Sequence, residues 1–143
     1  MKKIKKILLI HGPNLNLLGQ RDIQLYGNLT LTELENTVKK EAQKLGVQIT
    51  AFQSNHTGAL IDFLQKRRDA NGIIINPGAL AHYSYALHDA LLDHPAKKVE
   101  VHLSDIGVRE KWRRSSVTAP ACAKIISGKK MKGYLEALRY LLK

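Results

Sequence analysis

The sequence is poor in cysteine, since Cys122 is the only one among its 143 residues. A single thiol forms neither an intrachain disulfide nor a Cys-rich zinc site, which fits the reducing cytoplasm that we expect for this protein. No apolar stretch approaches the roughly 18 residues that a membrane span needs. The charged start resembles a signal peptide, but its apolar run, Ile7–Ile10, is too short for one. We therefore expect a soluble protein without membrane contact.

Acidic and aromatic residues are also scarce. The 12 Asp and Glu residues stand against 23 Lys and Arg, which gives a formal net charge of +11. Such an excess favours an acidic partner, either nucleic acid or a small anionic substrate. Aromatic residues make up 6% of the chain and do not alternate with the basic runs, as a stacking surface for single strands requires. We therefore expect most cations to be solvated and the partner to be a small anion rather than nucleic acid.

Two groups of cofactor motifs are missing. The chain contains neither GxGxxG nor GxxxxGK[ST], which argues against dinucleotide and P-loop nucleotide sites. Its six histidines lack HExxH or similar paired-ligand spacing, so we expect no metal site. The pattern favours a reaction that amino-acid side chains carry out without a cofactor.

Apolar runs alternate with segments of helical periodicity along the chain. The expected strands are 5–11, 47–53, 72–76, 98–103 and 123–127. The expected helices are 34–45, 56–68, 81–92 and 131–142. A capping box of Thr32 and Glu35 is expected to open the first helix, which Gly46 ends. The alternation predicts one α/β domain over residues 1–143, a doubly wound five-stranded parallel sheet with helices on both faces.

Polar residues gather where four of these strands end. The endings are Gly12-Pro13-Asn14, Ser54-Asn55-His56, Asn76-Pro77-Gly78 and His102-Leu103-Ser104. Because ligands of open parallel sheets bind beyond the carboxyl ends of the strands, we expect a functional rim there. In the fourth strand Glu100 and His102 point to the same face, as a general acid or base with an orienting carboxylate would. A purely structural Glu–His hydrogen bond is the alternative.

The first loop, Gly12–Gly27, is longer than the 2–6 residues that a βα connection needs, which is typical of a functional lid. It carries Arg21 and Tyr26. A tyrosine acts as a base only as its phenolate, which a guanidinium close by stabilises. Arg21 is the nearest candidate in sequence, and Arg113 is another if the fold brings it close. An ordinary half-buried loop aromatic is the alternative for Tyr26.

Taken together, these segments resemble the type II 3-dehydroquinate dehydratases, or type II dehydroquinases, of the shikimate pathway. The resemblance covers nearly the whole chain, and its remaining motifs are Gln53-Ser54-Asn55-His56, Ile73–Ala79 with His82, Val99–Ser104, Arg109-Glu110 and Gly133-Tyr134. It implies a flavodoxin-like fold, assembly as a homododecamer built of trimers, and dehydration of 3-dehydroquinate to 3-dehydroshikimate without a Schiff base or metal.

The resemblance also implies residue roles. Tyr26 would take the proton beside the ketone, Arg21 would stabilise its phenolate, and Asn14 would support the enolate. His102, oriented by Glu100, would protonate the departing hydroxyl. The residues that match the family's substrate contacts are Asn76, His82, Arg113, the backbone N–H groups of Leu103 and Ser104, and Asp89, which would reach a neighbouring subunit's site.

Some positions depart from the family pattern. Ile23 replaces a usual proline between the lid arginine and tyrosine, and Lys130 replaces a glycine near the end. The other departures are Asp105, Gly107, Tyr83 and His88. Two rival functions are a basic nucleic-acid-binding module and a carbohydrate- or phosphate-binding protein that has lost the chemistry. The presence of both Tyr26 and His102 favours the enzyme.

Overall fold

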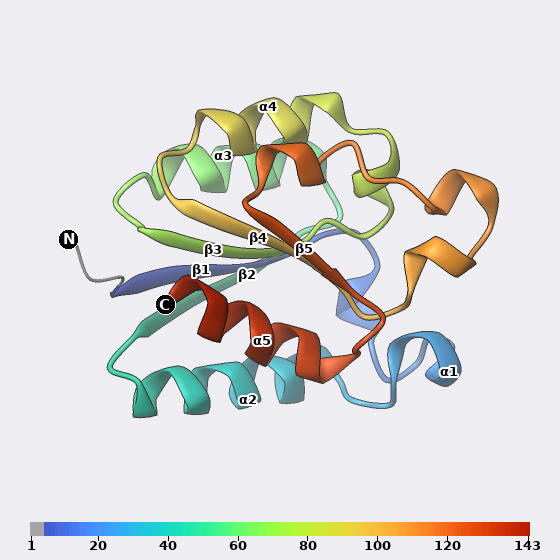
Figure 1. The fold of residues 1–143 in the computed structure, drawn as a ribbon, viewed down its shortest axis with the longest axis horizontal. Coiled ribbons are helices and arrows are strands. Elements are labelled where there is room, and N and C mark those ends of the chain that lie inside the picture. Colours follow the sequence, from blue (N-terminus) through green and yellow to red (C-terminus); the bar gives the residue numbers. More distant parts are fainter. Residues whose placement is uncertain (1–4) are drawn as a thin grey trace.

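Five parallel strands form the centre of the fold in a computed structural model that describes residues 5–143 (Figure 1). The strands are β1 (Lys6–His11), β2 (Gln48–Gln53), β3 (Gly72–Asn76), β4 (Lys97–His102) and β5 (Lys124–Ser127). Their order across the sheet is β2-β1-β3-β4-β5, and every neighbouring pair is parallel. The predicted five-stranded parallel sheet is confirmed.

Helices cover both faces of the sheet (Figure 1). One face packs against α2 (Leu31–Lys44) and α5 (Met131–Leu141), and the other against α3 (Thr57–Lys66) and α4 (Tyr85–Asp93). Because both faces are buried, the three middle residues of β3 are all isoleucine and every residue of the strand is buried. A short helix, α1 (Ile23–Tyr26), lies in the long loop after β1. Among residues 5–143, no helix is both long and apolar enough to cross a membrane.

The start of α2 differs from the prediction. Its capping box consists of Thr30 and Glu33, two residues earlier than the expected pair of Thr32 and Glu35. Both pairs have the spacing of the motif, and the apolar face of the helix, which begins at the half-buried Leu31, decides between them. Glu35 instead points toward the buried His11, whose Nε2 lies 3.1 Å from a Glu35 carboxylate oxygen. Gly46 follows the helix with a positive φ of 73°, as expected.

The third expected helix, 81–92, begins later than predicted. A 3₁₀ turn (Gly78–His82) comes first, and Ser84 caps α4 by accepting a hydrogen bond from the Leu87 N–H. The periodicity of 81–92 puts Tyr83 on the same side as Leu87 and Leu91, but Tyr83 precedes the helix and is 63% exposed. In α5 the buried positions are Gly133, Tyr134, Ala137, Leu138 and Leu141, whereas Leu135 and the following Leu142 are only half-buried.

Two loops interlock at the carboxyl edge of the sheet. The Gly12 N–H donates to the Asn76 carbonyl over 2.8 Å, and a Cβ added to Gly12 would lie 2.1 Å from the Pro77 carbonyl oxygen. In return, Gly78 adopts a φ of +62°, and a Cβ there would lie 3.0 Å from the Pro13 carbonyl oxygen. The glycines therefore let the loops after β1 and β3 approach closely and form one rigid floor.

Candidate active site

A cleft of about 500 Å³ opens at this carboxyl edge. Its lining residues come from the loops after β1, β3 and β4 and include the predicted Asn14, Arg21, Tyr26, Asn76, His82, His102, Leu103, Ser104 and Arg113. Glu100 lies beneath His102 and is fully buried. Asp89 does not line the cleft; its exposed carboxylate on α4 lies 2.9 Å from Nδ1 of His88.

The Tyr26 hydroxyl lies between two guanidinium groups. Arg21 Nη2 donates to it over 3.0 Å, and Arg109 Nη1 donates over 2.8 Å. The Arg21 guanidinium also lies over the Tyr26 ring, 3.9 Å from its centroid. Two guanidinium N–H groups thus donate to one phenol oxygen, the atom that would accept a proton if Tyr26 acts as a base.

Arg109 is a site residue whose contact with Tyr26 the sequence analysis did not predict. The sequence offers Arg113 as a second candidate guanidinium for Tyr26. In the structure, Arg113 Nε donates to Glu110 Oε2 over 2.9 Å, and Arg113 lines the cleft. Arg109 Nη1 also donates to Ser104 Oγ over 3.2 Å and thereby joins the lid to the end of β4. The available signal was its place inside the family motif Arg109-Glu110, just after β4.

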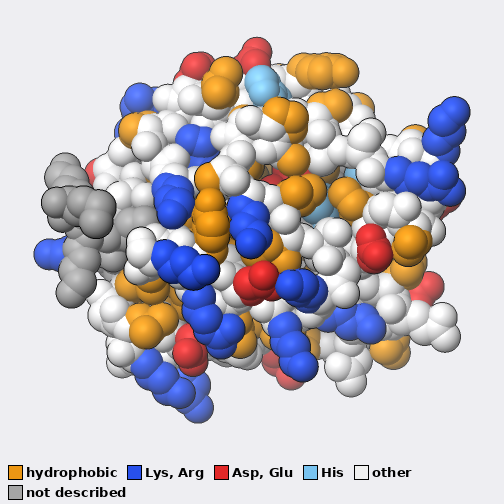
Figure 2. Space-filling view, in the orientation of Figure 1, with side chains coloured by type: hydrophobic (Ala, Val, Ile, Leu, Met, Phe, Trp, Pro, Cys, Tyr) orange, Lys and Arg blue, Asp and Glu red, His pale blue; other side chains and the backbone are white. Residues whose placement is uncertain are grey.

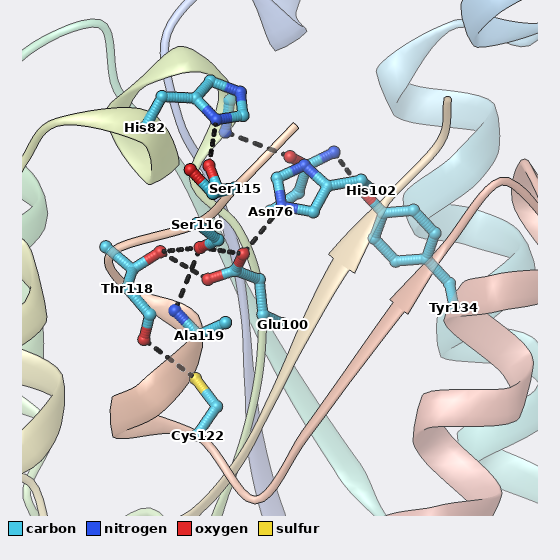
Figure 3. A network of polar contacts seen from close by, with 11 residues as sticks. Asn76, His82, Glu100, His102, Ser115, Ser116, Thr118, Ala119, Cys122 and Tyr134 are labelled. Carbon is cyan, nitrogen blue, oxygen red and sulfur yellow. Dashed lines mark hydrogen bonds and ion pairs between the residues drawn. The ribbon is translucent and has the colours of Figure 1, made fainter. Parts of the chain in front are cut away.

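The predicted pair of Glu100 and His102 forms in the structure (Figure 3). His102 Nε2 lies 2.7 Å from Glu100 Oε2, and His102 is only 5% exposed. Two hydroxyl groups complete the shell of the carboxylate: Ser116 Oγ donates to Oε2 over 2.6 Å, and Thr118 Oγ1 donates to Oε1. An ionised carboxylate only accepts hydrogen bonds, so the geometry favours a proton on His102 Nε2.

His82 lies beside His102, with 6.2 Å between the ring centroids. Its Nδ1 is 2.7 Å from the Ser115 carbonyl oxygen, which accepts only, so Nδ1 carries a proton. Burial lowers the pKa of His82, and the positive charges of His102 and Arg113 act in the same direction, although the bond to Ser115 opposes them. The neutral ring that results has Nε2 free to accept a hydrogen bond.

Two asparagines are held in fixed orientations at the floor of the cleft. Asn76 Nδ2 donates to the Tyr134 hydroxyl over 3.0 Å, while its Oδ1 accepts from the Gly78 N–H over 3.0 Å. Asn14 adopts a positive φ of 70°, and its N–H donates to Asn55 Oδ1 over 2.9 Å. The second N–H of the Asn76 amide remains available to a ligand.

The electrostatics of the cleft suit an anion. Its lining contains three arginines and two histidines, and no carboxylate. Within residues 5–143, no group of three His, Cys, Asp or Glu side chains is placed to hold a metal ion. Beyond the cleft, Lys and Arg side chains are scattered over the visible face of the molecule with few Asp or Glu among them (Figure 2).

Comparison with known proteins identifies what the chain resembles. Residues 5–142 match the model of the family described as dehydroquinase class II. A 3-dehydroquinate dehydratase of Roseiflexus castenholzii is 52% identical over 138 residues, covering 96% of this chain and 88% of the relative. One of Thermotoga neapolitana is 50% identical over 138 residues, covering 96% and 94%.

Solved structures agree with this result. A type II dehydroquinase from Butyrivibrio crossotus superposes with a TM-score of 0.94 at 44% identity, covering 97% of this chain and 98% of the other. A type II dehydroquinase from Propionibacterium acnes gives a TM-score of 0.93 at 33% identity, with 99% of each chain covered. Sequence and fold therefore point to the same family.

Proposed function

The chain belongs to the class II dehydroquinase family, and from this membership we propose that its cleft dehydrates 3-dehydroquinate to 3-dehydroshikimate, with Tyr26 as base and His102 as acid. The contacts of the Tyr26 hydroxyl carry the proposal. Arg21 and Arg109 hold that oxygen at 3.0 and 2.8 Å, so the negative charge of a phenolate is met on two sides. The same two cations reach the edge of the cleft where an anionic substrate binds.

The reaction proceeds in two proton transfers. The Tyr26 phenolate takes a proton from the carbon beside the ketone, and the electron pair of that C–H bond moves to the ketone oxygen, giving an enolate. Asn14, which also lines the cleft, supports the enolate oxygen. When the enolate collapses, the bond to the hydroxyl on the next carbon breaks, and a proton from His102 lets that hydroxyl leave as water.

His102 suits the role of acid because Glu100 supports its protonated form. The carboxylate lies 2.7 Å from the ring and is shielded completely from solvent, where electrostatic support is stronger than in water. Base and acid both line the cleft, one from the loop after β1 and the other from the end of β4, so a bound substrate can contact both.

The remaining cleft residues bind the substrate. Asn76, His82 and Arg113 take its hydroxyl groups, and the backbone N–H groups of Leu103 and Ser104 take its carboxylate, as their places in the lining allow. Asp89 lies on the outside of α4, where it is available to the cleft of a neighbouring subunit. From the family membership we further propose that the chain assembles into trimers and a homododecamer and acts in the cytoplasm.

The mechanism assigns every proton transfer to a side chain, so we propose that turnover needs no cofactor. Activity is expected to survive exhaustive treatment with chelators. Borohydride added together with substrate is expected to trap no covalent adduct, because no imine forms. A trapped adduct on a lysine of this chain would contradict the mechanism.

A direct dehydratase assay tests the two central assignments. The product is an enone that absorbs in the ultraviolet, so conversion is followed continuously. Tyr26→Phe and His102→Ala are each expected to lower kcat by roughly 100- to 10,000-fold, the range that general acid–base catalysis contributes. Neither change removes a buried apolar contact of the core clusters, so thermal unfolding serves as the control for folding. Normal turnover by Tyr26→Phe would show that Tyr26 is not the base.

A further inference from the structure

We propose that the segment Ser115–Thr118 sets the proton positions of both cleft histidines, with Ser116 and Thr118 as positioning residues that act on His102 through Glu100. The inference deepens the proposed function and rests on it. None of the roles assigned above requires this segment, which lies after Arg113 and before β5. Figure 3 shows it passing beneath His82 and alongside Glu100.

The Glu100 carboxylate has both oxygens occupied by hydroxyl groups. Thr118 Oγ1 donates to Oε1, and Ser116 Oγ donates to Oε2 over 2.6 Å. Glu100 and Thr118 are both 0% exposed, so solvent does not compete for these bonds. No Lys or Arg forms an ion pair with Glu100 in the described part of the chain, and the hydroxyl groups are therefore its principal stabilisation apart from His102.

The protons of the two hydroxyl groups are directed at Glu100 by their surroundings. Ser116 Oγ accepts the Ala119 N–H over 3.0 Å, which orients its lone pairs away from the carboxylate. The two hydroxyl oxygens are 3.1 Å apart, and each has only one proton to give. With three donors around it, the carboxylate remains an acceptor. His102 must then keep a proton on Nε2, and Nδ1 is the atom that gives its proton to the leaving hydroxyl.

The same segment imposes the opposite arrangement on His82. The Ser115 carbonyl oxygen accepts from His82 Nδ1 over 2.7 Å, which leaves Nε2 as an acceptor. A 2.6 Å hydrogen bond from the Val117 N–H to the Ala81 carbonyl anchors the segment to the turn that carries His82. One backbone segment thus prepares a proton donor at His102 and a proton acceptor at His82, with 6.2 Å between the rings. His102 can therefore protonate the substrate hydroxyl that leaves, whereas His82 can only accept a hydrogen bond from a substrate hydroxyl that stays.

A matched pair of variants isolates the Thr118 hydroxyl. Thr118→Ala and Thr118→Ser lose the same methyl group, and only the serine keeps the O–H donor. We expect Thr118→Ala to lower kcat for 3-dehydroquinate about tenfold with KM changed less than about twofold, because a hydrogen bond to a buried charge is lost while the substrate contacts stay. Thr118→Ser is expected to stay within about twofold of the unaltered protein. Ser116→Ala should act in the same direction as Thr118→Ala.

The second measurement does not depend on activity. In protein labelled with ¹⁵N-histidine, the NMR signal of His102 identifies the nitrogen that carries the proton. We expect an Nε2–H signal protected from exchange in the unaltered protein and in Thr118→Ser, and a weakened or lost signal in Thr118→Ala. If Thr118→Ala fails to fold, Thr118→Val, which keeps the side-chain volume, takes its place.

Equal kcat values and equal His102 signals in the alanine and serine variants would overturn the positioning role. A protein without any dehydratase activity, whose His102 signal still differs between the two variants, would overturn the proposed function and leave the control of the His102 proton standing. The two failures are therefore distinguishable.

Discussion

The two walls of the cleft are built differently. On the lid wall, Tyr26 ends the four-residue helix α1, and within residues 5–143 its hydroxyl bonds only the side chains of Arg21 and Arg109. On the strand wall, His102 ends the interior strand β4, which pairs with β3 and β5, and its partner Glu100 is fully buried with three donors. Ile23, which also belongs to the lid wall, is 59% exposed to solvent.

The difference assigns mobility to the base and rigidity to the acid. Arginine side chains are long and carry much rotational entropy, so the contacts of Tyr26 can be broken and remade as substrate enters. The contacts of His102 are buried, since its partner Glu100 is fully shielded from solvent, so water does not compete for them. Substrate can therefore pass the lid without disturbing the proton that the acid must deliver.

The largest effect in this comparison is expected from Glu100→Gln, which removes the charge of the strand wall without a change of size. We expect kcat to fall about a hundredfold, because His102 loses the buried carboxylate that supports its protonated form. KM should change little, since Glu100 does not line the cleft. Steady-state kinetics beside a thermal melt measures both. A kcat within twofold of the unaltered enzyme would show that the strand wall does not set the strength of the acid.

A smaller effect is expected from loss of either cation on the lid wall. Arg21→Ala and Arg109→Ala should each lower kcat about tenfold, because one of the two donors to the Tyr26 oxygen remains. The double variant should fall further than the product of the single effects, since it leaves the phenolate without a partner. A double-mutant cycle on kcat measures this coupling. Strictly multiplicative effects would mean that the two guanidinium groups act independently.

Stiffening the lid should have a still smaller effect. Ile23 occupies the first position of α1, where proline is favoured, and no hydrogen bond is formed by its N–H within the described residues. We expect Ile23→Pro to slow limited proteolysis of the loop and to change kcat by no more than about twofold. Gln24→Pro, one position later, is the matched control, because it removes the N–H that donates to the capping side chain of Asp22. An increase in cleavage of Ile23→Pro would contradict the prediction.

The smallest effect is expected from His94, which lies just before the amino end of β4, whereas the cleft lies at the carboxyl ends of the strands. Nδ1 of the buried His94 accepts the Ala96 N–H over 3.0 Å, and Nε2 lies 2.9 Å from the Arg67 carbonyl oxygen. Burial lowers the pKa of His94, and the charge of Lys98 adds to this, while the bond to Arg67 opposes it. The unfolded chain therefore takes up this proton first, at a pH near its ordinary value of about 6.5.

It follows that the His94 contribution to stability is complete above about pH 6.5 and declines as the pH falls from there toward the lower pKa of the folded state. Urea unfolding at pH 8 and pH 5 measures the change. His94→Gln should show a smaller loss between the two pH values than the unaltered protein. If both proteins lost the same free energy of unfolding between pH 8 and pH 5, His94 would not be the cause of the loss.

Much of the fold was predictable because its signals are local. The continuous apolar run of β3 was predicted with its observed ends, and the turns at Gly12 and Gly78 marked the edge where the cleft opens. Alternation in β4 was enough to place Glu100 and His102 on one face, since side chains of a strand alternate strictly. The start of α2 was not predictable, because two overlapping sequences have the spacing of a capping box and only the packing of Leu31 separates them.

The parts of the site that were not predictable lie in irregular chain. Arg109 and Arg113 are both near β4 in sequence. Arg109 follows one short 3₁₀ turn and contacts Tyr26, whereas Arg113 ends the next turn and contacts Glu110. The hydroxyl groups of Ser116 and Thr118 lie far from Glu100 in sequence and follow no periodic pattern. Tertiary packing alone brings them to the carboxylate.

The interlocked turns at Gly12 and Gly78 have a consequence for protein engineering. A side chain at either position would force the loops apart, and the displacement would reach Asn14 and Asn76 together, because each follows or precedes a proline of the same contact. Substitutions at these glycines are therefore expected to show strong epistasis and to be rescued only by compensating changes in the facing loop. A library that aims to alter the substrate range of this scaffold should keep both turns constant and vary the wall residues around them.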